Sequence, residues 1–382
     1  MTAQWTLPGC PGPPHWELCW DRLAAPFLPV LEPLAACAQN PVFHGEGDVL
    51  IHTRGVVGAL VQDEAWRAQP PPVRSVLLCA ALLHDIAKPA ASRVVEGRIR
   101  THGHASMGAA MVRRLLYRGA GQGLAPPGPR RREQVVALVR HHGLPIAFMK
   151  KQDPGLHAIR ATAGIPGGWL TILGRADILG RVSRDRDELL ERVTLFRELC
   201  KEQGCLDGPR SFASGEARMR YLRGDLDCPD APLPEPDGSR VTLLCGLPGA
   251  GKDTWARAHG QGRAVISLDR MRRRLGIKPD GDQGGVAKAA RSQARPLLAG
   301  REPLIWSAAN TTRAMRQRLV RYFRRYKAHV TITYIETPYQ ELIRRNRERG
   351  HGRLPDQVLE RLVDGLLTPA PAEANRVEFV PG

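Results

Sequence analysis

The 382-residue sequence lacks several features that would place it in a specialised class of protein. No apolar run reaches membrane-spanning length, and no basic segment followed by an apolar one marks a secretory leader. The eight cysteines include no Cys-x-x-Cys pair, so we expect free thiols in a reducing compartment. Internal repeats and low-complexity blocks are also missing. We therefore expect a globular, cytoplasmic protein.

Acidic residues are scarce relative to basic ones, and the imbalance is uneven along the chain. The formal net charge is +18, and residues 240–382 hold 27 Lys and Arg against 13 Asp and Glu, which leaves only +4 for the first 239 residues. A basic surplus in one half favours a polyanionic partner such as nucleic acid. A genome that prefers Arg over Lys is the alternative explanation.

Strand-like alternation is nearly absent before residue 225, where the readable segments have helical spacing. Helices are expected at Pro72–Lys88, Ala105–Arg118, Arg131–Arg140 and Asp187–Gln203. A stretch rich in Pro, Asp and Gly follows at 225–240, as in linkers. After it, short β-branched runs alternate with basic helices, and strands are expected at Val241–Cys245, Ala264–Leu268, Pro303–Trp306, His329–Ile335 and Arg376–Val380. This pattern predicts two domains: an all-α domain over 1–225, a linker at 226–240, and an α/β domain with a parallel sheet over 241–382.

The first strand of the second domain runs into a glycine-rich loop that is followed by a helix. Gly246, Gly249 and Gly251 let backbone amides point at phosphate oxygens, and Lys252 would reach the β- and γ-phosphates of ATP or another nucleoside triphosphate. Asp253 occupies the position that normally holds the Mg²⁺-binding hydroxyl, with Thr254 next. We therefore predict a site for ATP and Mg²⁺, in which the sequence does not decide whether Asp253 or Thr254 binds the metal.

Two further groups in this half carry charge toward the phosphates. Asp269 ends the second strand, where it could accept a proton from an attacking hydroxyl or simply cap the following helix. Arginines crowd the segment 341–350, including Arg345 and Arg349. They could form a solvated face, but near a nucleotide we favour a lid that stabilises the transferring phosphoryl group.

These elements together resemble the 5′-hydroxyl polynucleotide kinases of phage and bacterial RNA repair, over about residues 240–380. The resemblance implies phosphate-binding roles for Lys252 and Thr254, and a general base at Asp269. It further implies an acceptor-phosphate contact for Arg272, a substrate contact for Asn310, and lid roles on the donor phosphates for Arg349 and Arg345. An acidic residue is expected two places before Asn310, but this sequence has Ala308. A metal ligand of the family is therefore missing.

The first domain holds imidazole and carboxylate groups in a spacing suited to a divalent metal. His84 and Asp85 close a buried apolar run, His52 precedes them, and Asp177 follows far downstream. We predict His52, His84, Asp85 and Asp177 as ligands. His104 and His142 are favoured as further ligands, with a polar helix residue as the alternative for each, and Lys88 could neutralise a phosphate. A set this rich in histidine suits Mn²⁺, Ni²⁺ or Co²⁺ better than Mg²⁺.

This set resembles the HD phosphohydrolase superfamily over about residues 41–184, and most closely the HD domains of tRNA nucleotidyltransferases, which share the lead-in at 44–49. His44 heads that lead-in and is a candidate substrate contact. An HD domain joined to a polynucleotide kinase is similar to the HD-Pnk family of bacterial RNA end-healing enzymes.

That family resemblance implies removal of a 2′,3′-cyclic, 2′- or 3′-phosphate by the HD domain and phosphorylation of a 5′-hydroxyl by the kinase. The implied partners are RNA ends, with DNA left open, and a separate ligase; a homodimer is also left open. The alternatives are an HD nucleotidase fused to a small-molecule nucleoside or nucleotide kinase, and a non-enzymatic adaptor that binds RNA or a nucleotide.

Overall fold

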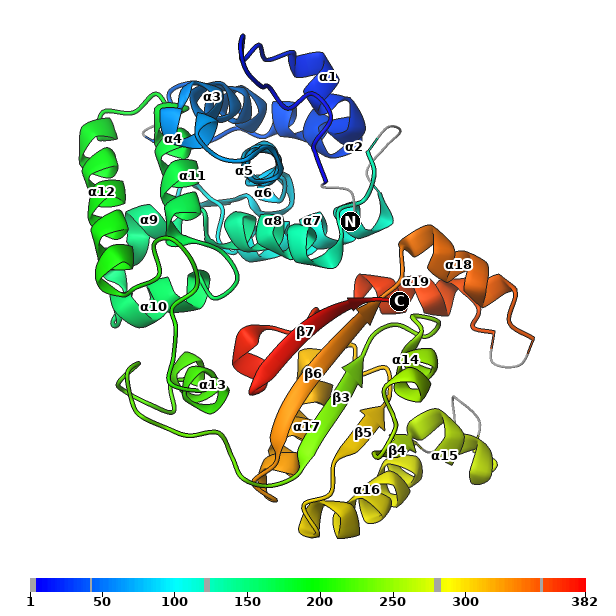
Figure 1. The fold of residues 1–382 in the computed structure, drawn as a ribbon. Coiled ribbons are helices and arrows are strands. Elements are labelled where there is room, and N and C mark those ends of the chain that lie inside the picture. Colours follow the sequence, from blue (N-terminus) through cyan, green and yellow to red (C-terminus); the bar gives the residue numbers. More distant parts are fainter. Residues whose placement is uncertain (1–4, 42, 120–123, 278–282, 351–352) are drawn as a thin grey trace. The chain divides into compact units, whose positions relative to one another are not determined.

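The computed structural model describes residues 5–41, 43–119, 124–277, 283–350 and 353–382. The chain divides into two compact units, Met1–Arg210 and Ser211–Gly382. Figure 1 shows the first unit in blue to green and the second in green to red. The division falls fifteen residues before the predicted boundary at residue 225. In the described part of the chain, no helix is long and apolar enough to span a membrane.

The first unit is a bundle of α-helices, as the sequence analysis predicted (Figure 1). Its longer helices are α3 (Val49–Gln62), α5 (Pro71–Leu83), α7 (His104–Arg118), α8 (Pro129–His141), α11 (Gly167–Leu179) and α12 (Arg186–Glu202). Its shorter ones are α1 (Trp20–Ala24), α2 (Leu28–Leu31), α4 (Glu64–Arg67), α6 (Lys88–Ala91), α9 (Leu144–Ala147) and α10 (Pro154–Ala161). Short 3₁₀ turns are η1 (Ala25–Phe27), η2 (Glu32–Ala36) and η3 (Phe148–Lys150).

Helices α3, α5, α8 and α11 pack against one another and form the centre of this bundle. Helix α5 is buried along almost its whole length, from Pro72 to Leu83. Where α3 passes the end of α11, a Cβ atom on Gly180 would lie 2.5 Å from the backbone nitrogen of Val56. Only glycine permits this approach, which brings the histidine of α3 toward the aspartate of α11.

Two local predictions for the first unit need correction. The helix expected over 72–88 ends at Leu83, and a turn separates α5 from α6. In addition, strands β1 (Arg93–Val95) and β2 (Arg98–Arg100) form an antiparallel hairpin where no strand was expected. Glu96 and Gly97 make its two-residue turn, and both have positive φ, as the turns of tight hairpins require.

Helix α13 (Gly215–Arg223) belongs to the second unit because its polar side chains bind the end of the chain there. The Arg223 guanidinium donates to the carbonyl oxygens of Ala372 at 2.9 Å and Glu373 at 2.7 Å. Asn375 Nδ2 donates to Glu216 at 3.0 Å. These bonds explain why the division precedes α13. The predicted linker at 226–240 is irregular up to β3 but lies inside the second unit.

The second unit contains the parallel five-stranded sheet that the sequence predicts, in the order β4-β5-β3-β6-β7. The strands are β3 (Arg240–Cys245), β4 (Ala264–Ser267), β5 (Leu304–Ser307), β6 (His329–Glu336) and β7 (Arg376–Pro381). Its remaining helices are α14 (Lys252–Ala258), α15 (Leu268–Arg274), α16 (Gln283–Ala299), α17 (Arg313–Arg324), α18 (Tyr339–Arg347) and α19 (Asp356–Asp364), with the turn η4 (Pro371–Glu373).

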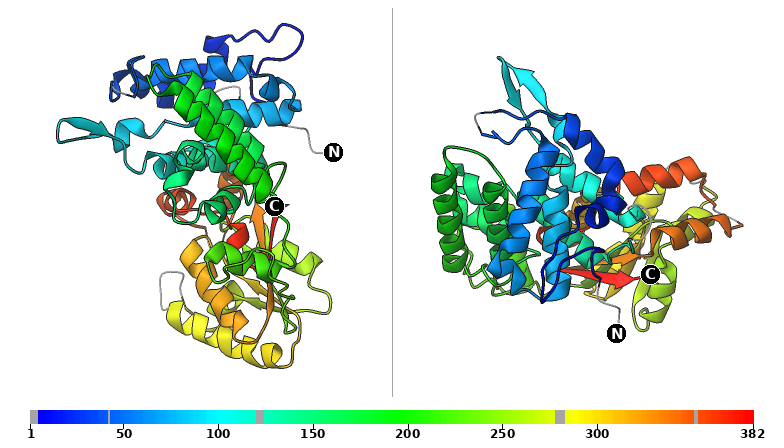
Figure 2. Two further views of the ribbon diagram at one scale, coloured as in Figure 1. Left: turned by 90° about the vertical axis from the view of Figure 1, so that its left-hand side faces the viewer. Right: turned by 90° about the horizontal axis from the view of Figure 1, so that it is seen from above.

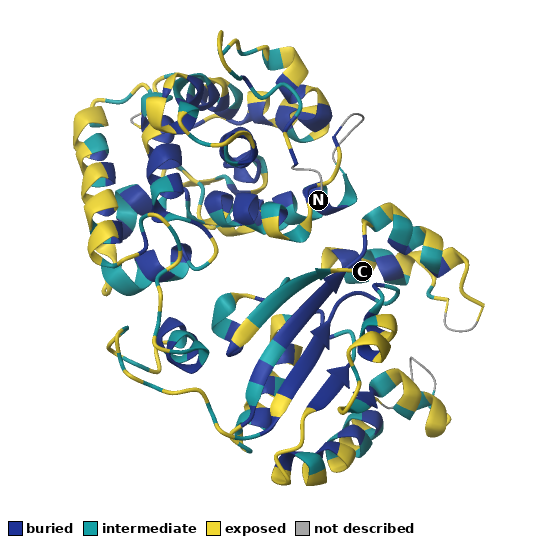
Figure 3. Cartoon of the chain, viewed as in Figure 1, coloured by how far each residue is buried: buried dark blue, intermediate teal, exposed yellow. Residues whose placement is uncertain are grey.

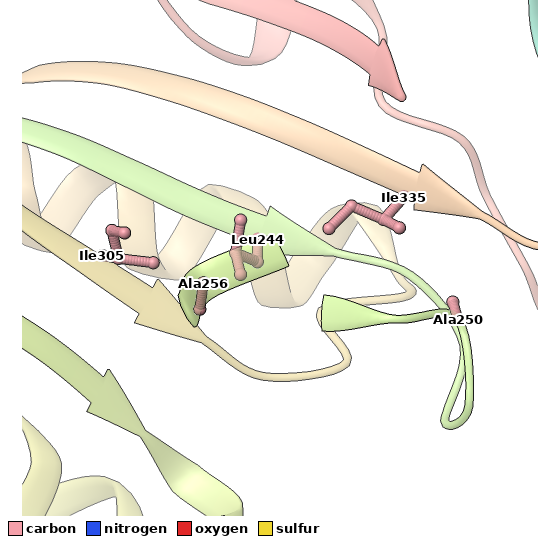
Figure 4. Close-up of a cluster of buried hydrophobic side chains, with 5 residues drawn as sticks. All are labelled: Leu244, Ala250, Ala256, Ile305 and Ile335. Atoms are coloured by element: carbon pink, nitrogen blue, oxygen red, sulfur yellow. The ribbon is translucent and has the colours of Figure 1, made fainter. Parts of the chain in front are cut away.

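Strand β3 lies in the middle of the sheet, between β5 and β6. From β3 the chain runs to the edge strand β4, returns through β5 beside β3, and then continues on the other side with β6 and β7, so the order reverses at β3. Ligands of such sheets bind beyond the carboxyl end of the strand at this reversal. The central strands are almost wholly buried (Figure 3), and Leu244, Ile305 and Ala256 pack together between β3, β5 and α14 (Figure 4).

Candidate active sites

The predicted metal ligands of the first unit converge in its interior. His52 comes from α3, His84 and Asp85 from the turn after α5, and Asp177 from α11. His52 Nε2 lies 3.3 Å from His84 Nε2, 3.1 Å from Asp177 Oδ1 and 3.7 Å from Asp85 Oδ2. His84 Nε2 lies 3.1 Å from Asp85 Oδ2. Four donor atoms from three helical segments therefore face one small volume.

Asp85 also faces a second group of donors. Its Oδ1 atom lies 3.4 Å from His104 Nε2 and 3.9 Å from His142 Nε2, and these two nitrogens are 3.3 Å apart. His104 begins α7 and His142 follows α8. Asp85 thus turns one oxygen toward each group. The arrangement offers room for one ion in each group, with the carboxylate between them.

The hydrogen bonds of the histidines show whether these groups fit a cation. The Nδ1 atoms of His84, His104 and His142 each lie 2.8 Å from a backbone carbonyl oxygen three residues earlier. A carbonyl only accepts, so Nδ1 carries the proton and Nε2 presents a lone pair. Lone pairs that face each other at 3.3 Å repel unless a cation lies between them. Among the described residues, the buried Asp85 Oδ1 has no hydrogen-bond partner either. The donor set therefore fits divalent metal ions.

Positive side chains surround the two ligand carboxylates. Lys88 Nζ lies 2.7 Å from Asp85 Oδ2 and donates to Gln39 Oε1 at 2.7 Å. Arg181 donates to both oxygens of Asp177, at 2.6 and 3.2 Å. Burial opposes ionisation of Asp85, yet its electrostatic contacts with His84 and Lys88 hold its pKa well below the usual range. Burial also lowers the pKa of His142 to about 4, so its imidazole is neutral, as a ligand must be.

His44 belongs to a third cluster of possible ligands, with Glu46 and His52, and is connected to the first group through these two residues. The Glu46 carboxylate lies 2.9 Å from His44 Nδ1 and 3.0 Å from His52 Nδ1, and it accepts from the Val182 amide at 2.9 Å. The negative charge of Glu46, 3.0 Å away, favours a proton on His52 Nδ1 without a well-aligned hydrogen bond, and with the proton there Nε2 is left for the metal. The predictions named His44 and missed Glu46, which orients both rings, and Arg181, which pairs with a ligand.

The glycine-rich loop of the second unit has the predicted form. Gly246, Gly249 and Gly251 all have positive φ, and Lys252 begins α14. The buried Lys252 ammonium donates to the carbonyl oxygens of Gly246 at 3.0 Å and Leu247 at 2.8 Å. Burial lowers its pKa, although the charges of Asp269 and Asp253 oppose that shift. The Lys252 ammonium is therefore held at the loop by two backbone carbonyls, and a bound phosphate could replace them as its hydrogen-bond acceptor.

A pocket of about 570 Å³ opens over this loop. The predicted residues that line it are Gly249, Gly251, Lys252, Asp253, Thr254, Asp269, Arg345 and Arg349. Asp253 and Thr254 both face it, so the structure leaves the Mg²⁺ ligand open between them. The pocket is also lined by the stacked rings of Trp255 and His259, with centroids 4.2 Å apart, which the sequence analysis did not single out.

Asp269 is not the residue that caps α15. That cap is Ser267, whose hydroxyl accepts from the backbone amide of Arg270 at 3.3 Å. The carboxylate of Asp269 is therefore available to the pocket. It pairs with Arg272 at 2.5 Å, and its side chain is 58 % exposed. The general-base role stays a prediction, but the competing helix-cap role belongs to another residue.

The arginines of the predicted lid contact the loop in one case. Arg345, on α18, donates to the Gly249 carbonyl at 3.3 Å and to the Thr337 hydroxyl at 3.1 Å, while Glu341 holds its Nε at 2.7 Å. Arg349 follows α18 and lines the same pocket. The two positive charges therefore lie on the side of the loop where donor phosphates would bind.

The structure places Asn310 away from this pocket's lining. Its side chain is buried, and Nδ2 donates to the Leu244 carbonyl at 2.7 Å, while its own carbonyl accepts from Arg316 at 3.1 Å. Asn310 thus fastens the chain after β5 to the end of β3. Its predicted contact with substrate stays a prediction, and it would require this buried bond to break.

Family comparisons agree with this two-part architecture. A family model described as an HD domain matches residues 49–161, and one described as an AAA domain matches residues 241–368. The chain is therefore a fusion of an HD domain and a P-loop kinase-like domain. No curated protein sequence matches it.

Solved structures similar to part of the chain include Kti12 of Chaetomium thermophilum in complex with ADP-AlF3, a gluconokinase from Sinorhizobium meliloti and a sugar kinase from a Janibacter species. Their sequence identities are 17 %, 21 % and 18 %, and their TM-scores are 0.30, 0.27 and 0.27. The matches cover 37 %, 38 % and 37 % of this chain and 88 %, 82 % and 85 % of the others.

Proposed function

We propose that the protein heals broken nucleic acid ends, with RNA as the preferred substrate. In this proposal the first unit removes a 2′,3′-cyclic, 2′- or 3′-phosphate, and the second phosphorylates the 5′-hydroxyl from ATP. The observation that carries the proposal is the presence, in one chain, of a metal-ligand set around Asp85 and a phosphate pocket that contains both Lys252 and Asp269. These sites suit opposite operations on a phosphate ester.

In the first unit, His52, His84, Asp85 and Asp177 would hold one ion, and Asp85, His104 and His142 a second. Bound metal would supply Lewis-acid activation of the phosphoryl group and an ionised water near neutral pH. Lys88 is placed to offset the charge that develops on the phosphate. The charge of Glu46 would favour the tautomer of His52 that can bind metal.

In the second unit, Lys252, Arg345 and Arg349 would hold the donor phosphates, because their positive charges surround the glycine-rich loop. Asp269 would accept the proton of the 5′-hydroxyl while the hydroxyl oxygen bonds to the γ-phosphorus of ATP and ADP leaves. Arg272, paired with Asp269, would hold the acceptor's phosphate and so align the hydroxyl. Mg²⁺ would be bound through the phosphates with Asp253 or Thr254.

Polynucleotide is preferred over a small acceptor because of the basic surplus in residues 240–382. The test is a salt series with two acceptors, a 5′-hydroxyl oligonucleotide and a nucleoside. Phosphorylation of the oligonucleotide should fall steeply with salt, with a slope of about −0.7 per phosphate contact, whereas the nucleoside reaction should barely change. Equal efficiency on both acceptors, or equal salt response, would replace this proposal with the small-molecule kinase.

A further inference from the structure

The β1–β2 hairpin has a form that neither active site explains. It projects from the helices of the first unit in both views of Figure 2. All of its residues except Ile99 are exposed, and Val94 retains 74 % of its surface. A two-stranded hairpin without a sheet or helix to cover it is marginally stable. The hairpin therefore contributes little to the stability of the first unit, and we look for a function that it could serve.

Side chains alternate across the hairpin, so its two faces differ. Val94 pairs with Ile99 on one face, while Arg93 pairs with Arg100 and Val95 with Arg98 on the other. Like charges directly opposite each other destabilise a strand pair. Within the hairpin only Glu96 opposes them, through an exposed contact with Arg100 at 3.3 Å. This arginine face therefore has an excess of positive charge that an external anion would stabilise.

The position of the hairpin links this charge to the metal ligands. It begins five residues after Lys88 and ends four residues before His104. Four extended residues reach at most about 14 Å, so Arg100 is held within that backbone distance of His104. A strand whose terminal phosphate occupies the metal site would thus have its neighbouring phosphates within reach of the hairpin.

We propose that the arginine face of this hairpin is a docking surface for the sugar–phosphate backbone of the strand whose end the HD domain processes. This inference rests on the proposed function, because it assumes a polynucleotide substrate at the metal site. Arg98 and Arg100 are the contacts. Arg93 donates to the carbonyls of Ala90 and Ser92 and anchors the base of the hairpin.

The test compares two substrates of one reaction, an oligonucleotide and a mononucleoside that both end in a 2′,3′-cyclic phosphate. In the double variant Arg98→Ala/Arg100→Ala, kcat/KM for the oligonucleotide should fall about tenfold and its salt slope should weaken by about 1.4, while the mononucleoside reaction is unchanged. The matched control is Arg186→Ala/Arg197→Ala, which removes two exposed arginines of α12 and should leave both substrates unaffected.

Equal loss on both substrates, or no loss on either, would overturn the docking role. A second measurement separates this inference from the proposed function. Amide hydrogen exchange of residues 93–100 in the full chain should slow when the oligonucleotide is added, whether or not the end is hydrolysed, because an exposed hairpin exchanges readily when free. Protection without hydrolysis would reject the phosphoesterase and keep the docking surface. Hydrolysis with unprotected amides would do the reverse.

Discussion

The two candidate sites are built to different degrees. In the HD unit, the side chains of His52, Asp85 and Asp177 are at most 3 % exposed, and the surrounding helices fix them. In the kinase unit, Asp269 is 58 % and Arg345 34 % exposed, and each is held by an ion pair with a neighbour on its own helix. The first site is set by interior packing. In the second site, Asp269 and Arg345 form exposed ion pairs within the protein, and a bound substrate could replace these partners.

The largest effect is expected on removal of Asp85, whose carboxylate faces both groups of metal donors. Asp85→Ala should lower phosphoesterase activity by at least about 10⁴-fold, because no bound ion would then ionise water near neutral pH. Bound metal, measured by elemental analysis, should fall with it, while 5′-kinase activity is retained. Loss of the kinase as well would show that the two units do not act independently.

Asp269→Ala should give the next largest effect, on the kinase alone. A positioned general base contributes about 10²–10⁴-fold, so kcat should fall within that range while ATP still binds. Single-turnover transfer from γ-labelled ATP measures the step. Asp356→Ala is the matched control, since it removes an exposed carboxylate of the same unit that does not belong to the lining of the pocket. If both variants lose the same activity, Asp269 is not the base.

Lys252→Ala should lower phosphoryl transfer by about 10²–10³-fold through loss of one preorganised donor to the phosphates. Hydrolysis of 2′,3′-cyclic phosphate should be unchanged. Both reactions can be measured in one sample with an oligonucleotide that is labelled at its ends. Retention of kinase activity would mean that the loop binds something other than a phosphate donor.

A smaller effect would sharpen the account of the HD site. Glu46→Gln should weaken metal binding by about 10–100-fold, as for other outer residues that orient a ligand histidine. Titration calorimetry with Mn²⁺ measures this without reference to activity. Glu64→Gln, an exposed glutamate of the same unit, serves as the control. Unchanged affinity for Mn²⁺ in the Glu46 variant would show that Glu46 does not support metal binding through His52.

How far the sequence predicts these sites depends on the distance between the residues involved. The glycine-rich loop and the His84–Asp85 pair lie within short segments whose residue types and order predict their geometry. Glu46 and Arg181 were missed because their roles arise only when α3 meets the end of α11, and the Glu46–Val182 bond joins residues 136 positions apart. No local pattern contains that contact.

Element prediction failed for a related reason. Helix α11 is buried on most sides, so it lacks the amphipathic period that identifies α7 or α12. Helix α3 buries one face, but apolar residues such as the exposed Ile51 also lie off that face and obscure its period in the sequence. The β1–β2 hairpin has too few residues to show alternation clearly, and its apolar positions are exposed. Asn310 follows a strand as a substrate-binding residue would, yet its buried bond to Leu244 is visible only in three dimensions.

The most direct test of the central claim uses one oligonucleotide that carries a 5′-hydroxyl and a 2′,3′-cyclic phosphate. Incubated with γ-labelled ATP and a panel of Mg²⁺, Mn²⁺, Ni²⁺ and Co²⁺, the intact protein should label the 5′ end and remove the terminal phosphate, and Asp85→Ala and Asp269→Ala should each abolish one of the two changes. Failure to alter either end with any of these metals, together with efficient phosphorylation of free nucleosides, would contradict the account.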